Sequence, residues 1–227
     1  MELDRLPETL YGQFAEVAQA LANGTRLRIA NFLCQKPRSV DELAQMLGQS
    51  TANTSAHLQV LRRAHLVTSR KEGRRVIYAL AGERALRLWL ALRDMGLEEL
   101  PQARDAMRAY AQEDALMPEL EADALLERVR NGELVLLDLR PRDEYDAAHL
   151  PDARSIPAVE LEQRLDELPR DRTVVAYCRG PFCVAAIRSV AALRAHGLRA
   201  RRLRSGIAEW RAANNPVETG RADETAS

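Results

Sequence analysis

The chain has 227 residues, enough for two domains of ordinary size, and 46% of them are apolar. Its 33 lysine and arginine residues balance its 33 aspartate and glutamate residues. This composition argues against a disordered chain and against a uniformly basic polyanion binder. No apolar run is long enough to cross a membrane, and the N-terminus lacks the pattern of a signal peptide, so we expect a cytoplasmic protein without a membrane partner.

The first hundred residues are predicted to be mainly helical. Apolar residues at helical spacing predict two helices, within residues 14–21 and 27–33, and Asn23-Gly24 separates them. Two further helices are expected over residues 40–47 and 51–64, joined by a glycine turn. Two short helices joined in this way are typical of the helix-turn-helix motif of DNA-binding proteins.

The ends of these two helices carry recognisable signals. Ser39 is a predicted N-cap, and Glu42 three residues later completes a capping box. Gly48 is expected to end this helix, and Ser50 is expected to cap the next one. The apolar positions expected to point into the core from that next helix are Leu58, Leu61 and Ala64.

Residues 66–80 predict a basic β-hairpin, because two β-branched stretches flank a charged turn that contains Gly73. Between residues 50 and 80, six lysine or arginine residues face one glutamate, a local excess of five positive charges. Polar side chains on the preceding helix would reach base edges, and basic side chains on the hairpin would hold phosphates. The residues predicted to contact DNA are Thr51, Asn53, Thr54, Ser55, His57, Gln59, Arg62, Arg70, Lys71, Arg74 and Arg75. For His57, packing between helices is an equal alternative.

Four segments, residues 21–29, 39–44, 55–64 and 66–78, resemble the ArsR family of bacterial winged-helix repressors. The resemblance implies a mainly-α winged helix-turn-helix domain that binds a palindromic operator in double-stranded DNA as a homodimer. The apolar residues between 85 and 97 cover more than one face of a predicted helix, as a dimerisation helix requires.

The cysteines depart from the sensing patterns of that family. Metal-sensing members carry a cysteine pair in the helix before the DNA-reading helix, where this chain has Ser39 and Asp41. Sulfide-responsive members use one cysteine in the second helix and one in the dimer helix, whereas here Cys34 has no counterpart in the predicted dimer helix. We therefore expect no metal site in this half and assign sensing to the second half of the chain.

A charged connector is predicted between the halves. Pro101 breaks the dimer-helix pattern, and residues 102–117 predict a helical linker before Pro118. The expected division is a DNA-binding and dimerisation domain over residues 1–100, a connector over 101–117, a second domain over 118–220 and a flexible tail over 221–227.

The second domain contains a cysteine between a strand and a helix. Residues 173–177 predict a buried strand, and residues 185–193 predict a helix, so Cys178 follows the strand directly. Backbone N–H groups of such a loop point inward, and the helix N-terminus adds partial positive charge. These features stabilise a thiolate or a persulfide anion and are expected to lower the pKa of Cys178, which makes it a candidate nucleophile.

Three ordered motifs, residues 135–157, 173–186 and 203–217, resemble the rhodanese (sulfurtransferase) family. The resemblance implies an α/β domain with a mostly parallel central sheet, in which Cys178 carries sulfane sulfur as a persulfide and needs no cofactor. It also implies activity like that of a thiosulfate sulfurtransferase. The active-site loop that the resemblance assigns comprises Cys178, Arg179, Gly180, Pro181, Phe182 and Cys183.

Two of these loop positions bear on how the sulfur would be held. Pro181 removes one N–H donor, so we expect Arg179 to help stabilise a persulfide. Related phosphatases and arsenate reductases need an arginine where this chain has Val184, which argues against oxyanion chemistry.

The neighbouring side chains leave alternatives open. Asp138 and Arg140 are expected to form a structural pair beside the loop, with a direct catalytic role as the alternative. Cys183 is predicted either to resolve an oxidised or persulfidated Cys178 or to fill the loop. The three cysteines do not suggest a disulfide framework, and metal capture by the two loop thiolates would need a third ligand that the sequence does not offer.

The sequence thus favours a DNA-binding regulator, most simply a repressor, whose second domain carries sulfane sulfur on Cys178 and senses reactive sulfur from a small donor such as thiosulfate or polysulfide. One alternative is a sulfurtransferase whose winged helix serves only for dimerisation. Another is a constitutive repressor with an inactive second domain. The basic hairpin argues against the former, and the intact cysteine argues against the latter.

Overall fold

The computed structural model describes residues 8–110, 116–118, 120–181 and 183–220. The chain divides into two compact units, residues 1–92 and 93–227. The first unit is a winged helix-turn-helix and the second is an α/β unit with a parallel sheet, which confirms the predicted fold class. The predicted flexible tail, residues 221–227, lies outside the described residues.

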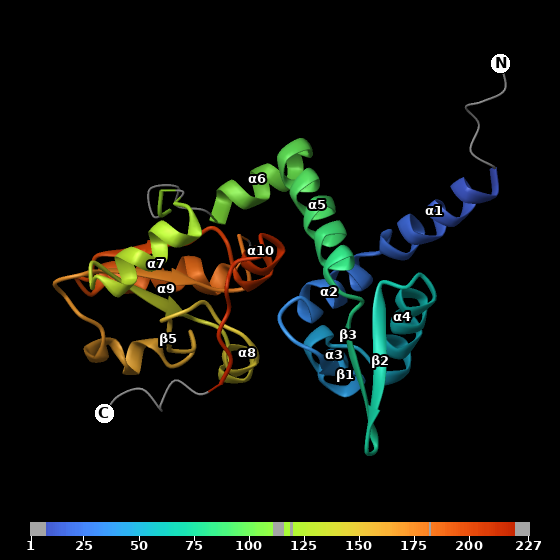
Figure 1. Ribbon diagram of the computed structural model, residues 1–227, viewed down its shortest axis with the longest axis horizontal. Helices are drawn as coiled ribbons and strands as arrows, with labels where there is room; N and C mark the ends of the chain where they lie inside the picture. The colour runs from blue at the N-terminus through green and yellow to red at the C-terminus, as the bar shows by residue number, and fades with distance from the viewer. Residues whose placement is uncertain (1–7, 111–115, 119, 182, 221–227) are drawn as a thin grey trace. The chain divides into compact units, whose positions relative to one another are not determined.

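The first unit surrounds a small antiparallel sheet with helices. In the sheet order β1-β3-β2, strand β3 pairs with both neighbours. The hairpin of β2 and β3 extends beyond the helices as a wing (Figure 1). The elements are α1 (Glu8–Leu21), α2 (Gly24–Leu33), β1 (Arg38–Ser39), α3 (Val40–Leu47), α4 (Thr51–Arg63), β2 (Val67–Glu72), β3 (Arg75–Leu80) and α5 (Glu83–Glu99), which belongs to this unit up to Leu92.

The predicted helix ends are confirmed at α3 and α4. The Ser39 hydroxyl accepts a hydrogen bond from the Glu42 amide at 3.2 Å, and the Glu42 carboxylate accepts one from the Ser39 amide at 2.7 Å. Gly48 has a φ of +67°, the left-handed conformation that ends α3 at low steric cost. The Ser50 hydroxyl accepts a hydrogen bond from the Asn53 amide, which starts α4.

Helices α1 and α5 expose apolar side chains. On α5, one set of residues including Leu86 and Trp89 is buried within the fold, while Leu88 and Met95 remain 40% and 66% exposed. On α1, Leu21 is buried, but Phe14 is 57% exposed. Apolar residues therefore cover more than one face of α5, as the sequence predicts.

The second unit is built on four parallel strands in the order β5-β4-β6-β7. Two 3₁₀ turns, Leu161–Gln163 and Leu165–Glu167, lie between β5 and β6. The helices and strands are α6 (Pro101–Tyr110), α7 (Ala122–Arg130), β4 (Leu134–Asp138), α8 (Arg142–Ala147), β5 (Arg154–Ser155), β6 (Thr173–Tyr177), α9 (Val184–Ala195), β7 (Ala200–Arg202) and α10 (Ile207–Ala212).

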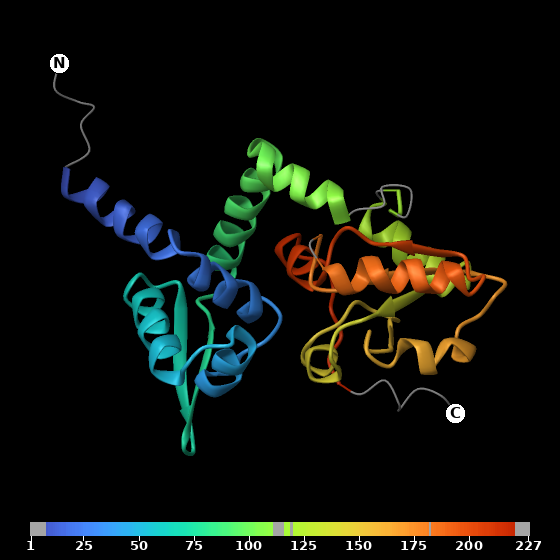
Figure 2. The same ribbon diagram turned by 180° about the vertical axis from the view of Figure 1, so that it is seen from behind.

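Helices cover both faces of this sheet, because alternate strand residues point to opposite faces. One face buries Ala176 of β6 against Val190 of α9, and the other buries Val175 of β6 with Leu125 of α7 and Trp210 of α10. Helix α7 lies in front of the sheet in Figure 1, and α9 lies in front of it in Figure 2. The core of the unit is therefore two apolar layers separated by the sheet.

The predicted helical connector is only partly helical. Residues Pro101–Tyr110 form α6, and residues 111–115 lie outside the described part of the chain. Leu116 pairs with Arg202 in a parallel bridge, and the Met117 amide donates to the Arg202 carbonyl at 2.8 Å. The end of the connector is extended because its backbone hydrogen bonds are made with β7 at the edge of the sheet.

The chain reverses its winding direction between β4 and β6. Strand β4 leads through α8 to β5 on one side, and β6 leads through α9 to β7 on the other. Since the loops after β4 and β6 diverge to opposite faces, their carboxyl ends leave room for a site, as in other doubly wound sheets.

No helix in the described ranges is both long and apolar enough to cross a membrane.

Candidate functional site

The N-terminal part of α4 presents polar side chains at the surface of the first unit. Thr51 and Asn53 are exposed, and Ser55, His57 and Gln59 are partly exposed. The Asn53 side-chain amide donates to the Gln49 side chain at 2.9 Å, which orients it. Of the other predicted contacts on α4, Arg62 is also exposed. This face has the donors and acceptors needed to contact base edges.

Thr54 is a correction to the predicted DNA contacts. Its side chain is fully buried, and its hydroxyl has no hydrogen-bond partner. It follows Asn53 on the helix but points inward, beside the core residue Leu58 one turn later. Thr54 therefore belongs to the core of the first unit and is not part of its surface.

The wing carries the predicted phosphate-binding side chains. Arg70 and Lys71 lie near the end of β2, and Arg74 and Arg75 lie at the turn and the start of β3. All four are exposed, and Arg70 forms a 2.6 Å ion pair with Glu72, the one acidic residue of the hairpin. The remaining basic side chains give the wing tip a positive surface suited to phosphates.

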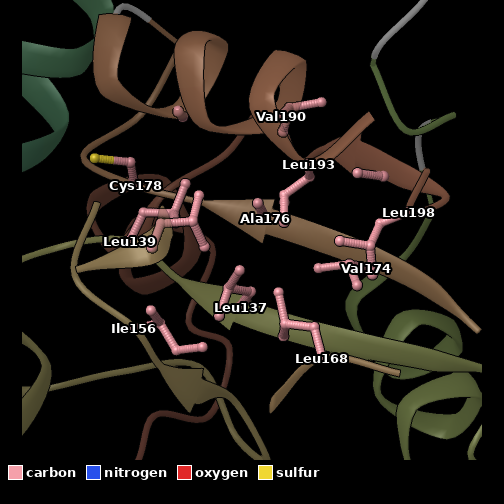
Figure 3. Close-up of a cluster of buried hydrophobic side chains, with 13 residues drawn as sticks. Leu137, Leu139, Ile156, Leu168, Val174, Ala176, Cys178, Val190, Leu193 and Leu198 are labelled. Atoms are coloured by element: carbon pink, nitrogen blue, oxygen red, sulfur yellow. The ribbon is translucent and has the colours of Figure 1, made fainter. Parts of the chain in front are cut away.

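Cys178 follows β6 directly and shares a sheet face with α9. By the alternation along β6, its side chain belongs with Val174 and Ala176, and it is 5% exposed. It lies at one edge of this apolar cluster, beside Leu139, with its sulfur pointing away from Ala176 and Val174 (Figure 3). The predicted position of Cys178 between a strand and a helix is therefore observed.

The loop after Cys178 returns to it through a disulfide. Cys178 and Cys183 are bonded, with Cα atoms 6.2 Å apart, a pairing that the sequence did not suggest. The Cys183 amide donates to the Gly180 carbonyl at 3.2 Å, which closes a tight turn, and Cys183 is the N-cap residue of α9. Phe182 lies outside the described residues.

Arg179 pairs with a buried carboxylate of α8. Its guanidinium donates three hydrogen bonds to the carboxylate of Glu144, at 2.6 to 3.1 Å, and Glu144 is fully buried on α8. Burial of a carboxylate is costly unless a charge-assisted partner is present, and Arg179 is that partner. This contact supports a structural role for Arg179, which joins the loop to α8, and the expected stabilisation of a persulfide by Arg179 stays a prediction.

Three residues that sequence reasoning had not singled out hold the loop from its other side. A Cβ on Gly206 would lie 2.6 Å from the Gly180 amide nitrogen and would also clash with the Cys178 carbonyl oxygen. The Glu209 carboxylate accepts the Gly206 amide at 2.7 Å and leaves no room for a side chain on Gly180, whose φ is +115°. The buried guanidinium of Arg202 donates to the Pro181 carbonyl at 3.2 Å.

The sequence contains a signal for only part of this support. Gly206 and Glu209 belong to the third rhodanese-like motif, and Glu144 belongs to the first, so the motifs mark their positions without giving their contacts. Arg202 belongs to no motif. Burial, and then the charge of Arg204, lower the pKa of Arg202. Arg202 is therefore a partly desolvated cation beside the loop.

Asp138 and Arg140 form a fully buried ion pair at the end of β4. The Arg140 guanidinium donates to Asp138 at 2.6 Å and to the Ala148 carbonyl at 2.6 Å, and the Arg140 amide also donates to Asp138. By alternation, Asp138 points to the sheet face of Tyr177, opposite that of Cys178. Burial, and then the Asp138 charge, raise the pKa of Tyr177 well above its usual range. The geometry favours a structural role for the pair.

The first unit also shows what replaces the cysteines of metal-sensing relatives. Ser39 caps α3, and Asp41 in the first turn of α3 accepts a hydrogen bond from the Thr51 hydroxyl at 3.5 Å. Cys34 is buried and takes no part in the disulfide. Within the described ranges, no group of three histidine, cysteine, aspartate or glutamate side chains is arranged to hold a metal ion.

Comparisons with known proteins match both units. A model of the bacterial regulatory proteins of the arsR family matches residues 23–69, and a model of the rhodanese-like domain matches residues 121–213. The HTH-type transcriptional regulator Rv0324 of Mycobacterium tuberculosis is 42% identical over 214 residues, which cover 93% of this chain and 92% of that protein.

Other relatives match one unit each. A protein named Sulfurtransferase from Allochromatium vinosum is 33% identical over 104 residues, 45% of this chain and 95% of that protein. Among solved structures, the homodimeric winged helix-turn-helix DNA-binding domain of Mb0332 from Mycobacterium bovis is 36% identical. It covers 44% of this chain and 95% of its own, with a TM-score of 0.41.

Replacing one member of the buried ion pair should destabilise the second unit strongly. Asp138→Asn removes the charged partner that Arg140 contacts at 2.6 Å inside the core, and we expect a loss of about 3–5 kcal/mol in the free energy of unfolding. The matched control is Asp152→Asn, which removes an exposed pair with Arg130 and should cost about 0–1 kcal/mol. Urea unfolding followed by Trp210 fluorescence, in a Trp89→Phe background, measures both. Equal losses for the two variants would contradict the assigned role.

Removing the buried hydroxyl of Thr54 should stabilise the first unit without weakening DNA binding. Thr54→Val keeps the side-chain shape and deletes a buried polar atom without a partner, so we expect a gain of about 1–2 kcal/mol. The comparison variant is Asn53→Ala, on the adjacent exposed position, which should weaken DNA binding. Thermal unfolding and DNA titration report the two effects. Similar losses of DNA affinity in both variants would show that Thr54 reaches the DNA.

Proposed function

The chain belongs to the ArsR family of bacterial regulatory proteins and carries a C-terminal rhodanese-like domain, and we propose that it is a DNA-binding repressor controlled by reactive sulfur. In this proposal Cys178 accepts a sulfane sulfur from a small donor such as thiosulfate or polysulfide, and the change in the loop alters the affinity of the first unit for its operator. The observation that supports this most directly is that Cys178 lies between β6 and α9, in a loop closed by a disulfide. The same chain carries a β2–β3 hairpin with basic side chains.

DNA binding by the first unit is supported by where its polar and basic side chains lie. The surface of α4 offers Thr51, Asn53, Ser55, His57 and Gln59 to base edges, and Arg62 and the four basic residues of the wing offer positive charge to phosphates. Most of the affinity for DNA would come from the phosphate contacts, and the α4 side chains would supply sequence preference.

We propose a homodimer on a palindromic operator. Support comes from the apolar side chains that the fold leaves exposed: Tyr11 and Phe14 on α1, and Leu88, Leu92 and Met95 on α5. Exposed apolar side chains of this number, on two helices, are typical of a surface that a second protein covers. A two-fold axis in the dimer would then match two half-sites of the operator.

Sulfur loading is supported by the chemistry of the loop. Cys178 precedes α9, whose N-terminus adds partial positive charge near the sulfur. The Cys178 thiolate would attack the outer sulfur of thiosulfate, form a persulfide and release sulfite. The match to the Allochromatium vinosum protein named Sulfurtransferase supports the same chemistry in this chain, with turnover as a sulfurtransferase when an acceptor is present.

The division of the chain forms part of the proposal. Residues 1–100 would bind DNA and dimerise, residues 101–117 would connect, and residues 118–220 would form the sulfur-handling domain. A regulator with these properties would act in the cytoplasm, next to the DNA and to the reduced sulfur pool.

Removing two charges from the wing should weaken DNA binding through lost phosphate contacts. For Lys71→Ala with Arg74→Ala, we expect weaker binding to all sequences and a salt dependence reduced by about one ion per lost phosphate contact. Arg128→Ala with Arg130→Ala, on α7, removes the same charge and serves as the control. Fluorescence anisotropy at several salt concentrations gives both slopes. Equal slopes for the two double variants would argue against the wing as a phosphate contact.

The sulfur response should require Cys178. We expect thiosulfate or polysulfide treatment to change the affinity for the DNA upstream of the protein's own gene by about 5- to 150-fold, the range of a coupling free energy of about 1–3 kcal/mol. Cys178→Ser should bind that DNA without responding, and Cys34→Ser, which alters the other unit's buried cysteine, should respond like the native protein. Titrations at one fixed salt concentration test this. A response that survives Cys178→Ser would refute the assignment of the sensor.

A further inference from the structure

The second cysteine of the loop is placed to react with the first. Cys178 and Cys183 are bonded, and the turn that brings them together is fixed by the hydrogen bond from the Cys183 amide to the Gly180 carbonyl. Arg202 holds the same turn through the Pro181 carbonyl. The backbone therefore accommodates the two sulfur atoms at bonding distance with the strand and the helix on either side in place.

We propose that Cys183 resolves the Cys178 persulfide, so that the loop releases the sulfane sulfur as hydrogen sulfide and ends as the Cys178–Cys183 disulfide. The inference rests on the proposed loading of Cys178 and adds a second activity, reduction of sulfane sulfur by the chain's own two thiols. It also assigns Cys183 as a second reacting residue, the first of the two roles that the sequence leaves open.

The two steps balance without an outside reductant. In the first, the Cys178 thiolate bonds to the outer sulfur of thiosulfate, the sulfur–sulfur bond of thiosulfate breaks, and sulfite leaves with the electron pair. In the second, the Cys183 thiol gives up its proton and attacks the Sγ atom of Cys178, the bond to the outer sulfur breaks, and that sulfur leaves with the electron pair and takes up the proton to become hydrosulfide. The outer sulfur is reduced to sulfide, and the two cysteine sulfurs are oxidised to a disulfide.

Burial favours this internal attack over attack by an outside thiol on the same atom. Cys178 is 5% exposed, so its Sγ atom is poorly accessible from solvent, whereas Cys183 lies in the same short loop. A neighbouring group held in such a position acts at an effective concentration far above that of a dissolved thiol. Cys183 is also the N-cap residue of the 12-residue helix α9, where partial positive charge favours the attacking thiolate.

The scheme predicts a single turnover for each reduced chain. The disulfide is more oxidised than the two thiols by a pair of electrons. A dithiol reductant must therefore supply that pair before the chain can react again. With no reductant present, we expect about one sulfite and about one sulfide for each chain that starts with both loop thiols reduced.

The experiment treats the full-length protein, reduced with a phosphine and then desalted, with excess thiosulfate under anaerobic conditions. Sulfite and sulfide are quantified, and mass spectrometry follows the loop peptide. The native protein and Cys34→Ser should release both products and end with the Cys178–Cys183 disulfide. Cys183→Ser, with Cys183→Ala as a second variant, should release sulfite, release no sulfide and retain the additional sulfur atom on Cys178.

The products distinguish the failure of each proposal. Sulfite without sulfide from the native protein, with the persulfide retained, would overturn the role of Cys183 and leave the loading of Cys178 intact. Sulfide release by the Cys183 variants equal to that of the native protein would also overturn it. Loss of sulfite in both Cys183 variants would place Cys183 in the loading step. Absence of sulfite and persulfide from the native protein, with thiosulfate and with polysulfide, would overturn the proposed loading and this inference with it.

Discussion

The second unit depends on one buried ion pair, Asp138 with Arg140, at the end of β4. Through the Arg140 guanidinium it joins β4 to the Ala148 carbonyl, and through Asp138 it lies against Tyr177 at the end of β6. The pair is therefore connected to the two strands whose diverging ends create space for the cysteine loop. Because burial of two charges offsets much of their attraction, its main effect is to specify one arrangement of these strand ends. A second buried carboxylate, Glu144, extends the same principle to the loop through Arg179.

Local signals in the sequence were sufficient for much of this architecture. The capping box at Ser39, the glycine at position 48 and the charged turn of the wing act over a few residues, so their structural outcome could be predicted directly. The same holds for Cys178, whose position between β6 and α9 follows from the pattern on either side. Contacts between distant segments were not predictable in this way. The partner of Arg179 is 35 residues away on α8, and the contact of Arg202 with Pro181 depends on the strand order.

Thr54 and the disulfide show two further limits of sequence analysis. A threonine on a DNA-reading helix has the chemistry for base contacts, but the rotation of α4 about its axis decides whether it faces the DNA or the core, and here it faces the core. Pairing of Cys178 with Cys183 depends on a turn with a left-handed Gly180, which spacing alone does not fix. In the first unit, Ser39 and Asp41 take part in hydrogen bonds at the start of α3.

The low exposure of Cys178 also determines which molecules its sulfur meets. At 5% exposure, with Gly206 and Glu209 packed closely against its loop, Cys178 offers little surface to solvent. A slim anion with a terminal sulfur would reach such a buried atom end-on more easily than a disulfide inside a peptide or a branched alkylating reagent would. The burial of Cys178 would thus favour sulfur donors of small cross-section. If the proposed loading of Cys178 takes place, linear sulfur chains would therefore be better donors than bulky oxidised thiols.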